Sequence, residues 1–408
     1  MIKHIRSIFR TGKYLGFWLV SGSLHAAADP SDTWQPYVSE TITYDDNLFR
    51  LSKDANPRIF LGPGRSKEDV VSRLTAGSKI NYEFGRQKLL LDLAVDDNRF
   101  VNNDGLDHVS TNDQGTLKWE LGKYLTGDLG YGYRHYLGSF QNTQFYVKDM
   151  IDDNNAFIDV NFAWHPRWRL RTGGRWFQSI HSAEIRSILD VSRYTGILGF
   201  DYVSPSRNTA GLEYRYTEAD LPNRQPSIIE LIDNHYREHN VLATTQWSIS
   251  PLLRVEGNIG YTSREHQQFS ERNYSGETWQ FSLNWSPTDN TLFSLATWRE
   301  LRSAQDLTAS YFVSEGVSLS PAWSITQKLS LTTKVGYEKR NYAGDPRTVI
   351  TDLPQRRDEG VTGLVMLSYM PLRWTELNLA YQTEHRDSNY RYRDYTYNSV
   401  FATAKLKF

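Results

Sequence analysis

Three arginines at alternating positions are the strongest candidate for binding chemistry in this 408-residue sequence. They are Arg169, Arg171 and Arg175, and large apolar residues flank them. Because successive side chains of a β-strand point to opposite faces, the three guanidinium groups are expected on one face. Guanidinium groups bind carboxylates through paired hydrogen bonds, so one interpretation is a cationic track for an anionic or hydroxyl-rich polymer. The other is a ladder of salt bridges to Asp159 and Asp201 that stiffens the wall.

Charged residues of both signs recur at alternating positions along the rest of the chain. Together with the three arginines they form the set expected to line a lumen and to contact a polysaccharide. The other members are Asp92, Lys118, Glu120, Arg134, Glu213, Arg215, Arg254, Glu256 and Lys334, and Glu376 follows the same pattern. Because both signs occur, a filter for ions of one sign is not expected.

Three Asp-Asp-Asn triplets are candidates for cation binding. They are residues 45–47, 96–98 and 152–154. Carboxylate and amide oxygens can hold Ca²⁺, but the spacing of these residues matches no calcium loop. Asp and Asn favour turns in any case, so solvated strand ends are the prediction and no metal or cofactor is expected.

Two further motifs could suggest catalysis. His235, Glu238 and His239 fit the H-x-x-E-H pattern of a zinc peptidase family, but that chemistry needs a helix. The segment instead runs into an alternating, strand-like stretch from residue 241, so we interpret the match as chance. Ser182 lies beside His181 without an evident acid partner. No catalytic residue is therefore assigned, and the chain is not predicted to be an enzyme.

The last ten residues show which element positions the charged side chains. One face of this segment is apolar, with Val400, Ala402, Ala404, Leu406 and Phe408, and the other is polar except for Phe401. This alternation predicts a strand with one wet face and one apolar face. The ending resembles the closing strand of bacterial outer-membrane barrels, whose terminal aromatic residue is read by the assembly machinery. Phe408 is accordingly expected to be a barrel assembly signal.

Turn and loop signals divide the chain into hairpins. Short turns are predicted near residues 85–86, 123–124, 165–166, 204–205, 251, 287–288, 326–327 and 371–372. Longer polar loops are predicted near residues 46–68, 101–109, 139–153, 182–190, 219–234, 267–272, 303–309, 343–357 and 389–395. The count gives 18 strands. The predicted fold is an all-β, transmembrane, antiparallel up-and-down β-barrel with short periplasmic turns and longer extracellular loops.

Two observations favour lipid rather than a second sheet against the apolar faces. Seven tryptophans lie close to predicted short turns, as an interfacial girdle requires: Trp119, Trp164, Trp168, Trp247, Trp285, Trp323 and Trp374. The opposite faces carry too many charges for a dry sandwich core, where each unpaired charge is costly.

Composition excludes other classes of membrane protein. The chain is 39% hydrophobic with a mean hydropathy of -0.58, so it cannot be a bundle of membrane helices. Its net charge is -1, which gives no reason to expect a nucleic-acid partner. It contains no cysteine, as is common for proteins of the bacterial envelope.

The amino terminus predicts secretion. A basic region with Lys3, Arg6, Arg10 and Lys13 precedes a short apolar run and three alanines at residues 26–28. This order is typical of a signal peptide. We expect a cleaved signal at residues 1–28, a periplasmic lead-in at 29–34 and the barrel at 35–408.

Residues 36–50, with the sequence PYVSETITYDDNLFR, resemble the EpsL-type outer-membrane proteins. These are β-barrel porins associated with exopolysaccharide biosynthesis clusters of Gram-negative bacteria. The resemblance implies a passive outer-membrane channel that exports an exopolysaccharide. It also implies contact with outer-membrane lipid and with periplasmic or inner-membrane export components.

Two alternatives remain open at this stage. One is an outer-membrane enzyme that acts on lipid or polysaccharide. The other is a plugged barrel whose external loops bind glycan. Loops 46–68 and 343–357 are long enough to fold inward and narrow the mouth.

Overall fold

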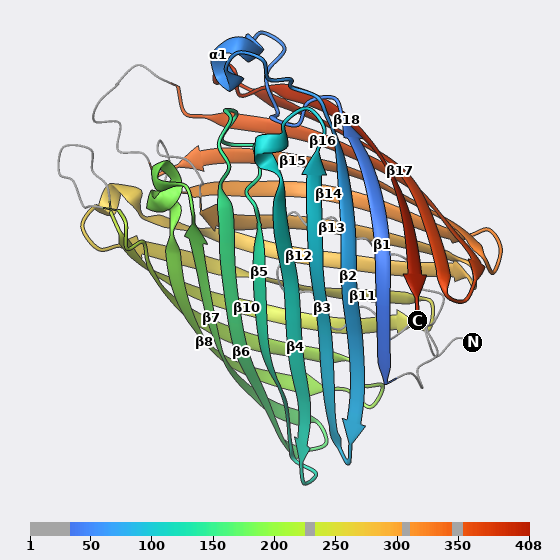
Figure 1. Cartoon of the computed structure of the whole chain (residues 1–408). Coiled ribbons are helices and arrows are strands. Elements are labelled where there is room, and N and C mark those ends of the chain that lie inside the picture. Colours follow the sequence, from blue (N-terminus) through green and yellow to red (C-terminus); the bar gives the residue numbers. More distant parts are fainter. Residues whose placement is uncertain (1–32, 225–232, 304–310, 345–353) are drawn as a thin grey trace.

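One antiparallel sheet of 18 strands closes on itself to form a barrel (Figure 1). The computed structural model describes residues 33–224, 233–303, 311–344 and 354–408. The first nine strands are β1 (Trp34–Asp45), β2 (Asp69–Phe84), β3 (Gln87–Phe100), β4 (His108–Leu121), β5 (Leu125–Leu137), β6 (Met150–His165), β7 (Trp168–His181), β8 (Val191–Val203) and β9 (Thr209–Asp220). The others are β10 (His235–Ser250), β11 (Leu253–His266), β12 (Tyr274–Thr288), β13 (Thr291–Ser303), β14 (Tyr311–Ser324), β15 (Leu329–Ala343), β16 (Arg357–Leu372), β17 (Thr375–Ser388) and β18 (Tyr395–Lys407).

Each strand pairs with its neighbours in sequence, and β1 also pairs with β18. The predicted up-and-down barrel of 18 strands is therefore confirmed. Short turns lie at one end of the barrel and longer loops at the other, and the carboxy terminus lies at the short-turn end (Figure 1).

The helices of the described residues are all short and lie in the long loops. They are α1 (Pro57–Leu61) and the 3₁₀ helices η2 (Asp104–Leu106), η3 (Glu184–Leu189) and η4 (Ser270–Arg272). In the part of the chain that the structure describes, no helix is long and apolar enough to cross a membrane.

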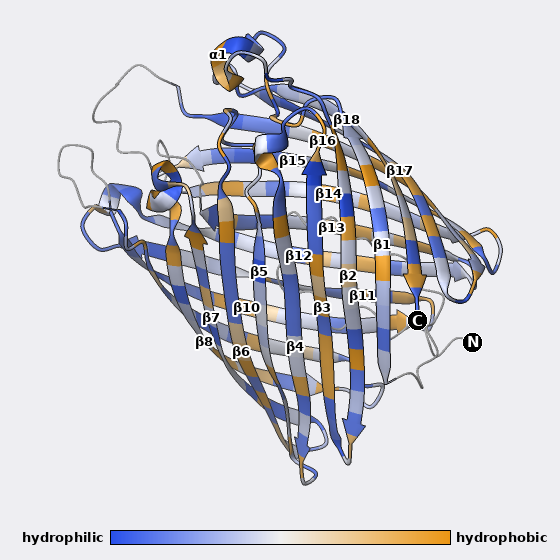
Figure 2. Ribbon diagram, in the orientation of Figure 1, coloured by the Kyte–Doolittle hydropathy of each residue, from blue (hydrophilic) through white to orange (hydrophobic). Residues whose placement is uncertain are grey.

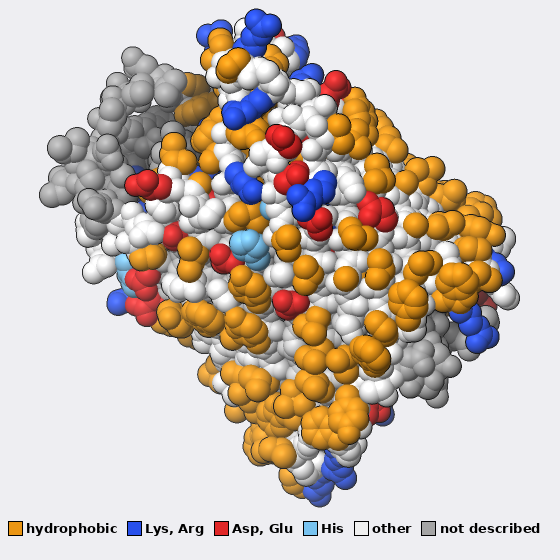
Figure 3. Space-filling model, viewed as in Figure 1, with side chains coloured by type: hydrophobic (Ala, Val, Ile, Leu, Met, Phe, Trp, Pro, Cys, Tyr) orange, Lys and Arg blue, Asp and Glu red, His pale blue; other side chains and the backbone are white. Residues whose placement is uncertain are grey.

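Side chains alternate across the wall of the barrel, as the period of two predicts. In β12, Trp279, Phe281, Leu283 and Trp285 share the outer face, and the polar residues between them face inward. Figures 2 and 3 show the result, with hydrophobic residues alternating along the strands and covering much of the outer surface. An apolar exterior around a closed sheet is the arrangement that lipid requires.

The predicted tryptophan girdle lies at the short-turn end. Six of the seven tryptophans are exposed on the outside of the barrel or in its turns: Trp164, Trp168, Trp247, Trp285, Trp323 and Trp374. Indole rings prefer the boundary between acyl chains and headgroups, so this row marks the periplasmic edge of the bilayer.

The predicted boundaries need small corrections. The barrel begins at Trp34, one residue before the predicted start, and residues 1–28 and most of the lead-in lie outside the described residues. Two short turns lie two residues later than predicted, at 289–290 and 373–374. The reason is that Pro287 and Pro371 sit in irregular pairings just before these turns, where a missing N–H is tolerated.

Nine residue pairs join β1 to β18 and close the barrel. Beyond the last pair, the Asp46 side chain accepts hydrogen bonds from the backbone and side-chain amides of Asn398. At the other end, the Phe408 backbone amide donates to the Pro36 carbonyl, at 2.9 Å. The role of Phe408 in assembly stays a prediction.

Three loops pack together inside the external end of the barrel, and Tyr392 of a fourth loop packs against them. Their small apolar core, which we call the loop cap, consists of Phe49, Leu51, Ala55, Leu61, Val71, Phe100, Leu106 and Phe140. Val71 and Phe100 are inward-facing residues of β2 and β3, so the loops cover this part of the inner wall. Loop 46–68 thus narrows the mouth as expected, whereas most of loop 343–357 lies outside the described residues.

We predict that Leu106→Ala loosens the loop cap without unfolding the barrel. Leu106 is fully buried, and truncating such a leucine costs about 2–5 kcal/mol. Trypsin cleavage in loop 46–68 should therefore become roughly 30-fold faster or more, because cleavage follows the population of the opened state. Val101→Ala is the control, since Val101 is 70% exposed in the same connection. Equal cleavage of the two variants would contradict the packing described.

Candidate functional site

All twelve charged residues predicted to line the lumen lie on inward-facing positions of their strands. The pairings of Arg169 with Asp201 and of Lys118 with Asp128 illustrate the common face. The structure therefore gathers these residues in one lumen, while their contact with a solute stays a proposal.

The arginines of β7 are engaged by carboxylates of neighbouring strands. Arg169 and Arg171 both contact Asp201, at 2.6 and 2.7 Å, and Arg171 also contacts Glu213. Arg175 contacts Asp159 at 2.9 Å. Of the two interpretations, this geometry favours a cross-strand salt-bridge ladder over an open cationic track. The guanidinium groups are already held by protein carboxylates.

Most of the other predicted residues are also in ion pairs, some across strands and some within one strand. Asp92 contacts Lys79 at 2.9 Å, and Arg134 contacts Asp153. Arg215 contacts Glu213, and Arg254 contacts Glu256. Lys118, Glu120 and Lys334 make no ion pair with any residue that the structure describes.

The lumen is wet near the short turns. The side chains of Lys79 and Asp92 are 45% and 48% exposed although they face inward, so water reaches this half of the barrel. The side chains of Arg254 and Arg169 are also partly exposed. This end forms a hydrated vestibule.

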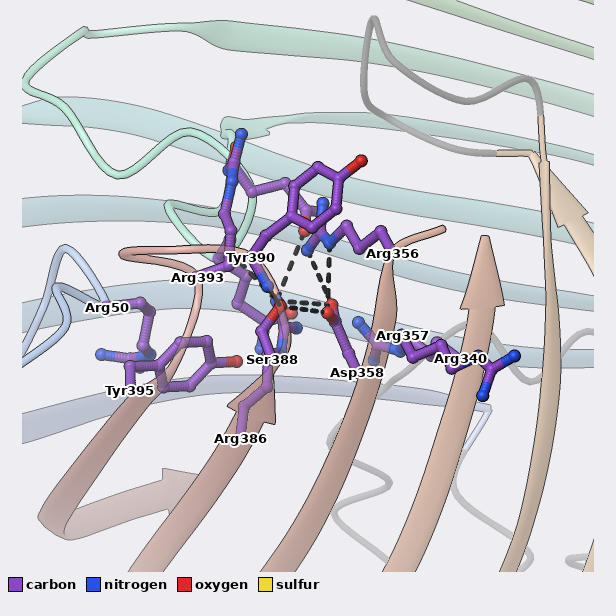
Figure 4. A network of polar contacts seen from close by, with 12 residues as sticks. Arg50, Arg340, Arg356, Arg357, Asp358, Arg386, Ser388, Tyr390, Arg393 and Tyr395 are labelled. Atoms are coloured by element: carbon purple, nitrogen blue, oxygen red, sulfur yellow. Dashed lines mark hydrogen bonds and ion pairs between the residues drawn. The ribbon is translucent and has the colours of Figure 1, made fainter. Parts of the chain in front are cut away.

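The external half is packed much more tightly, around an arginine cluster that the sequence analysis missed. Figure 4 shows Arg356, Arg386 and Ser388 gathered around Asp358. Arg356 binds Asp358 at 2.6 Å, and Ser388 donates to the same carboxylate at 2.7 Å. The side chains of Arg386 and Asp358 are each only 2% exposed.

A second part of the cluster lies on the adjacent strands. Glu338 of β15 contacts Arg340 at 2.7 Å and Arg302 of β13 at 3.7 Å. On β17 and β18, Tyr395 donates to Glu384 at 2.6 Å. The sequence did contain a signal for this cluster. Charged residues stand two apart at 338 and 340 and at 384 and 386, a spacing that places them on the same face of a strand. Their burial was not predictable, since it comes from distant loops.

Loop 138–149 covers this cluster from the opposite side of the mouth. It connects β5 to β6, yet Gln141 donates to Glu384 of β17 at 3.4 Å. Arg386 donates to the Gln141 carbonyl, and Arg393 donates to the Asn142 carbonyl at 2.6 Å. Because Glu384 and Arg386 face inward, the loop crosses part of the external opening.

The crossing loops are held in strained backbone conformations. Among the described residues, four non-glycine residues have positive φ, and three of them are Arg50, Gln144 and Tyr392 in these loops. Gln144 donates to the Arg50 carbonyl at 2.7 Å, so two of these residues stabilise each other. Such strain persists only where the surroundings fix it, as is common at functional sites.

Tyr146 anchors the same loop from within the cap. Its ring packs against Phe49, and the Arg65 guanidinium lies 3.4 Å from the ring centroid. Burial raises the pKa of the Tyr146 phenol above its ordinary value.

Aromatic rings on the inner wall are largely covered by cations. Guanidinium groups lie over Tyr342 at 4.1 Å, over Tyr395 at 4.7 Å and over Tyr397 at 3.5 Å. All three rings are buried. They stabilise the wall by cation–π contact and do not present open faces to a solute.

The motifs suggestive of catalysis do not form sites. His235 and His239 lie on the outer face of β10, whereas Glu238 faces inward and binds Arg264. His181 does have an acid partner, Asp190 at 3.0 Å, which corrects the expectation that it lacks one. Ser182 accepts a hydrogen bond from the Met150 amide.

The Asp-Asp-Asn triplets are satisfied by their neighbours. Asp45 binds Arg50, Asp96 accepts from Thr75, and Asp152 accepts from Tyr133. In the described ranges, no cluster of three His, Cys, Asp or Glu residues could hold a metal ion.

Comparison with known proteins matches residues 239–408 to a family model described as "Putative beta-barrel porin 2". The chain is a β-barrel of the Gram-negative outer membrane. Its residues 239–408 are similar to that porin family. No curated protein matches the sequence.

Several solved structures are similar to most of this chain. OccK2 (OpdF) of Pseudomonas aeruginosa is 9% identical, with a TM-score of 0.49 over 92% of this chain and 98% of that one. OccK9 (OpdG) of the same organism is 12% identical, with a TM-score of 0.49 and the same coverage. OccAB3 of Acinetobacter baumannii is 11% identical, with a TM-score of 0.47 over 92% and 99%.

We predict that Asp358→Asn strongly destabilises the barrel. The change leaves the Arg356 and Arg386 guanidinium groups buried without their counter-charge, which costs about 3–5 kcal/mol. The urea concentration at the midpoint of unfolding should fall accordingly. It can be measured from the different gel mobilities of the folded and the unfolded barrel. Asp92→Asn breaks a half-exposed pair and should cost at most about 1 kcal/mol. Similar losses in both variants would contradict the difference in burial.

Proposed function

We propose that the barrel is a passive channel for small polar solutes, with its narrowest part at the external mouth. The observation that supports this most is loop 138–149, which reaches from β5 and β6 to the inward-facing Glu384 and Arg386 of β17. A solute entering from outside must pass beside this loop and then reaches the hydrated vestibule around Lys79 and Asp92.

The charges of the wall support a channel of low ionic selectivity. Both signs occur, and most of the cations are paired with carboxylates, so the wall presents dipoles rather than a field of one sign. Polar solutes would exchange hydrogen bonds with water and with these groups, and no single contact would trap them. No covalent chemistry is required for such passage.

Export of an exopolysaccharide is the second candidate, and it rests on the resemblance of residues 36–50. The hydrated, charged vestibule would suit a hydrophilic polymer arriving from periplasmic or inner-membrane export components. The loop cap and the covered rings at Tyr342, Tyr395 and Tyr397 argue against it, because a polymer would need the loops to move. Small solutes are therefore the better-supported cargo.

We predict that replacing residues 139–148 with a short Gly-Ser linker raises the single-channel conductance severalfold. The linker removes the segment that contacts β17, so the mouth should widen and liposomes should become permeable to larger neutral sugars. The control shortens loop 267–273, whose residues hydrogen-bond to His266 and Asp233 and not to the loop cap.

An unchanged conductance in the 139–148 variant would contradict a constriction at this loop. Deleting the protein from its host distinguishes the two candidate cargoes, small solutes and an exopolysaccharide. Loss of polymer from the medium with polymer retained in the periplasm would support export, whereas unchanged secretion with reduced uptake of small solutes would support the proposed function.

A further inference from the structure

Six exposed basic residues lie in the short periplasmic turns. They are Arg86, Lys123, Arg167, Arg207, Lys328 and Arg373, one in each of six of the eight turns. The turns contain a single acidic residue, Asp289. The longer external loops, by contrast, carry both signs in near-equal number. The periplasmic rim is thus a cationic ring, which we call the turn ring.

The cations of the turn ring form no ion pair with any carboxylate of the described residues. Instead, Arg86 donates to the Gly122 carbonyl and Lys328 to the Pro371 carbonyl, each at 2.8 Å. Arg167 donates to the Tyr202 hydroxyl at 3.2 Å. These contacts hold the side chains against neighbouring turns while leaving their charge uncompensated.

Basic residues on the outer face at the external end behave differently. Arg99 contacts Asp97 and Asp107, and Lys339 contacts Glu359. Carboxylates thus compensate these two basic residues of the outer face, whereas none compensates the cations of the turn ring.

The turn ring lies at the depth of lipid headgroups. Arg167 stands between Trp164 and Trp168, and Arg373 precedes Trp374, so the cations adjoin the tryptophan girdle on its aqueous side. Figure 3 shows basic side chains at the lower tip and at the right edge of the molecule, beyond the hydrophobic surface. Both places correspond to short turns in Figure 1.

We propose that the turn ring binds the phosphate groups of anionic phospholipids in the periplasmic leaflet. Three features favour lipid over an acidic protein: the cations are spread over most of the turns, they adjoin the girdle, and they lack carboxylate partners. One cation near an anionic membrane surface contributes about 1 kcal/mol. That energy corresponds to about a fivefold preference for an anionic over a zwitterionic headgroup. The ring would fix the depth of the barrel in the bilayer.

The test uses the full-length barrel in nanodiscs and quenching of its tryptophans by brominated lipids. Brominated phosphatidylglycerol is compared with brominated phosphatidylcholine at low salt, where we expect about a fivefold preference for the anionic lipid. The preference should fall toward one at about 1 M NaCl, where the Debye length is about 3 Å. It should also fall toward one in a variant with Gln at all six positions.

A matched control replaces six exposed basic residues of the external end with Gln, namely Lys53, Arg58, Lys67, Lys148, Arg237 and Arg391. This variant changes the net charge equally and should keep the preference. Heat-modifiable migration checks that both variants are folded. Equal quenching by the two lipids in the wild type overturns the proposal, as does a preference that survives in the turn variant. A third outcome also overturns the proposal. If the wild type shows no lipid preference but binds an acidic periplasmic protein in a salt-sensitive way, the turn ring is a site for that protein instead.

Discussion

The need to pair every backbone N–H and C=O group within lipid governs this structure. A sheet with a free edge would leave unpaired groups in the hydrocarbon layer, so the nine residue pairs between β1 and β18 are the condition for all the rest. Once the sheet is closed, strict alternation assigns half of each strand to lipid and half to the lumen. The charged residues of a protein with 23% charged composition are then gathered in a narrow space.

Enclosure explains how these charges are arranged. Side chains such as Arg169, Arg171 and Arg175 could have formed an open basic track, but carboxylates on adjacent strands lie within ion-pair distance of them. In the vestibule water also solvates the pairs. At the external end the loops exclude water, so each buried guanidinium group depends on a specific acid such as Asp358 or Glu338.

Much of the fold was predictable from the sequence because the dominant signal is local. Alternation with a period of two, turn residues and loop lengths predicted the strand number, and the inward position of residues such as Asp92 and Lys334 follows from the same pattern. The loop cap was only partly predictable. Gln141 and Glu384 are separated by 243 residues, and no local pattern reports such a contact.

Other features depended on tertiary structure in the same way. The partner of His181 is Asp190, which becomes its neighbour only when loop 182–190 folds back over β7. Phe401, the exception to the alternation of the last strand, faces the lumen between Ala380 of β17 and Thr43 of β1. Alternation fixes which face a side chain occupies, whereas its partners and its burial depend on the closed barrel and its loops.

The central claim is that the lumen is open toward the periplasm and constricted at the external mouth. Because the chain contains no cysteine, Lys118→Cys places a unique thiol on the inner wall near the short turns. In proteoliposomes of known orientation, a bulky maleimide should label this thiol rapidly from the periplasmic side, and only a small maleimide should reach it from the external side. Rapid labelling by the bulky reagent from the external side would contradict the account.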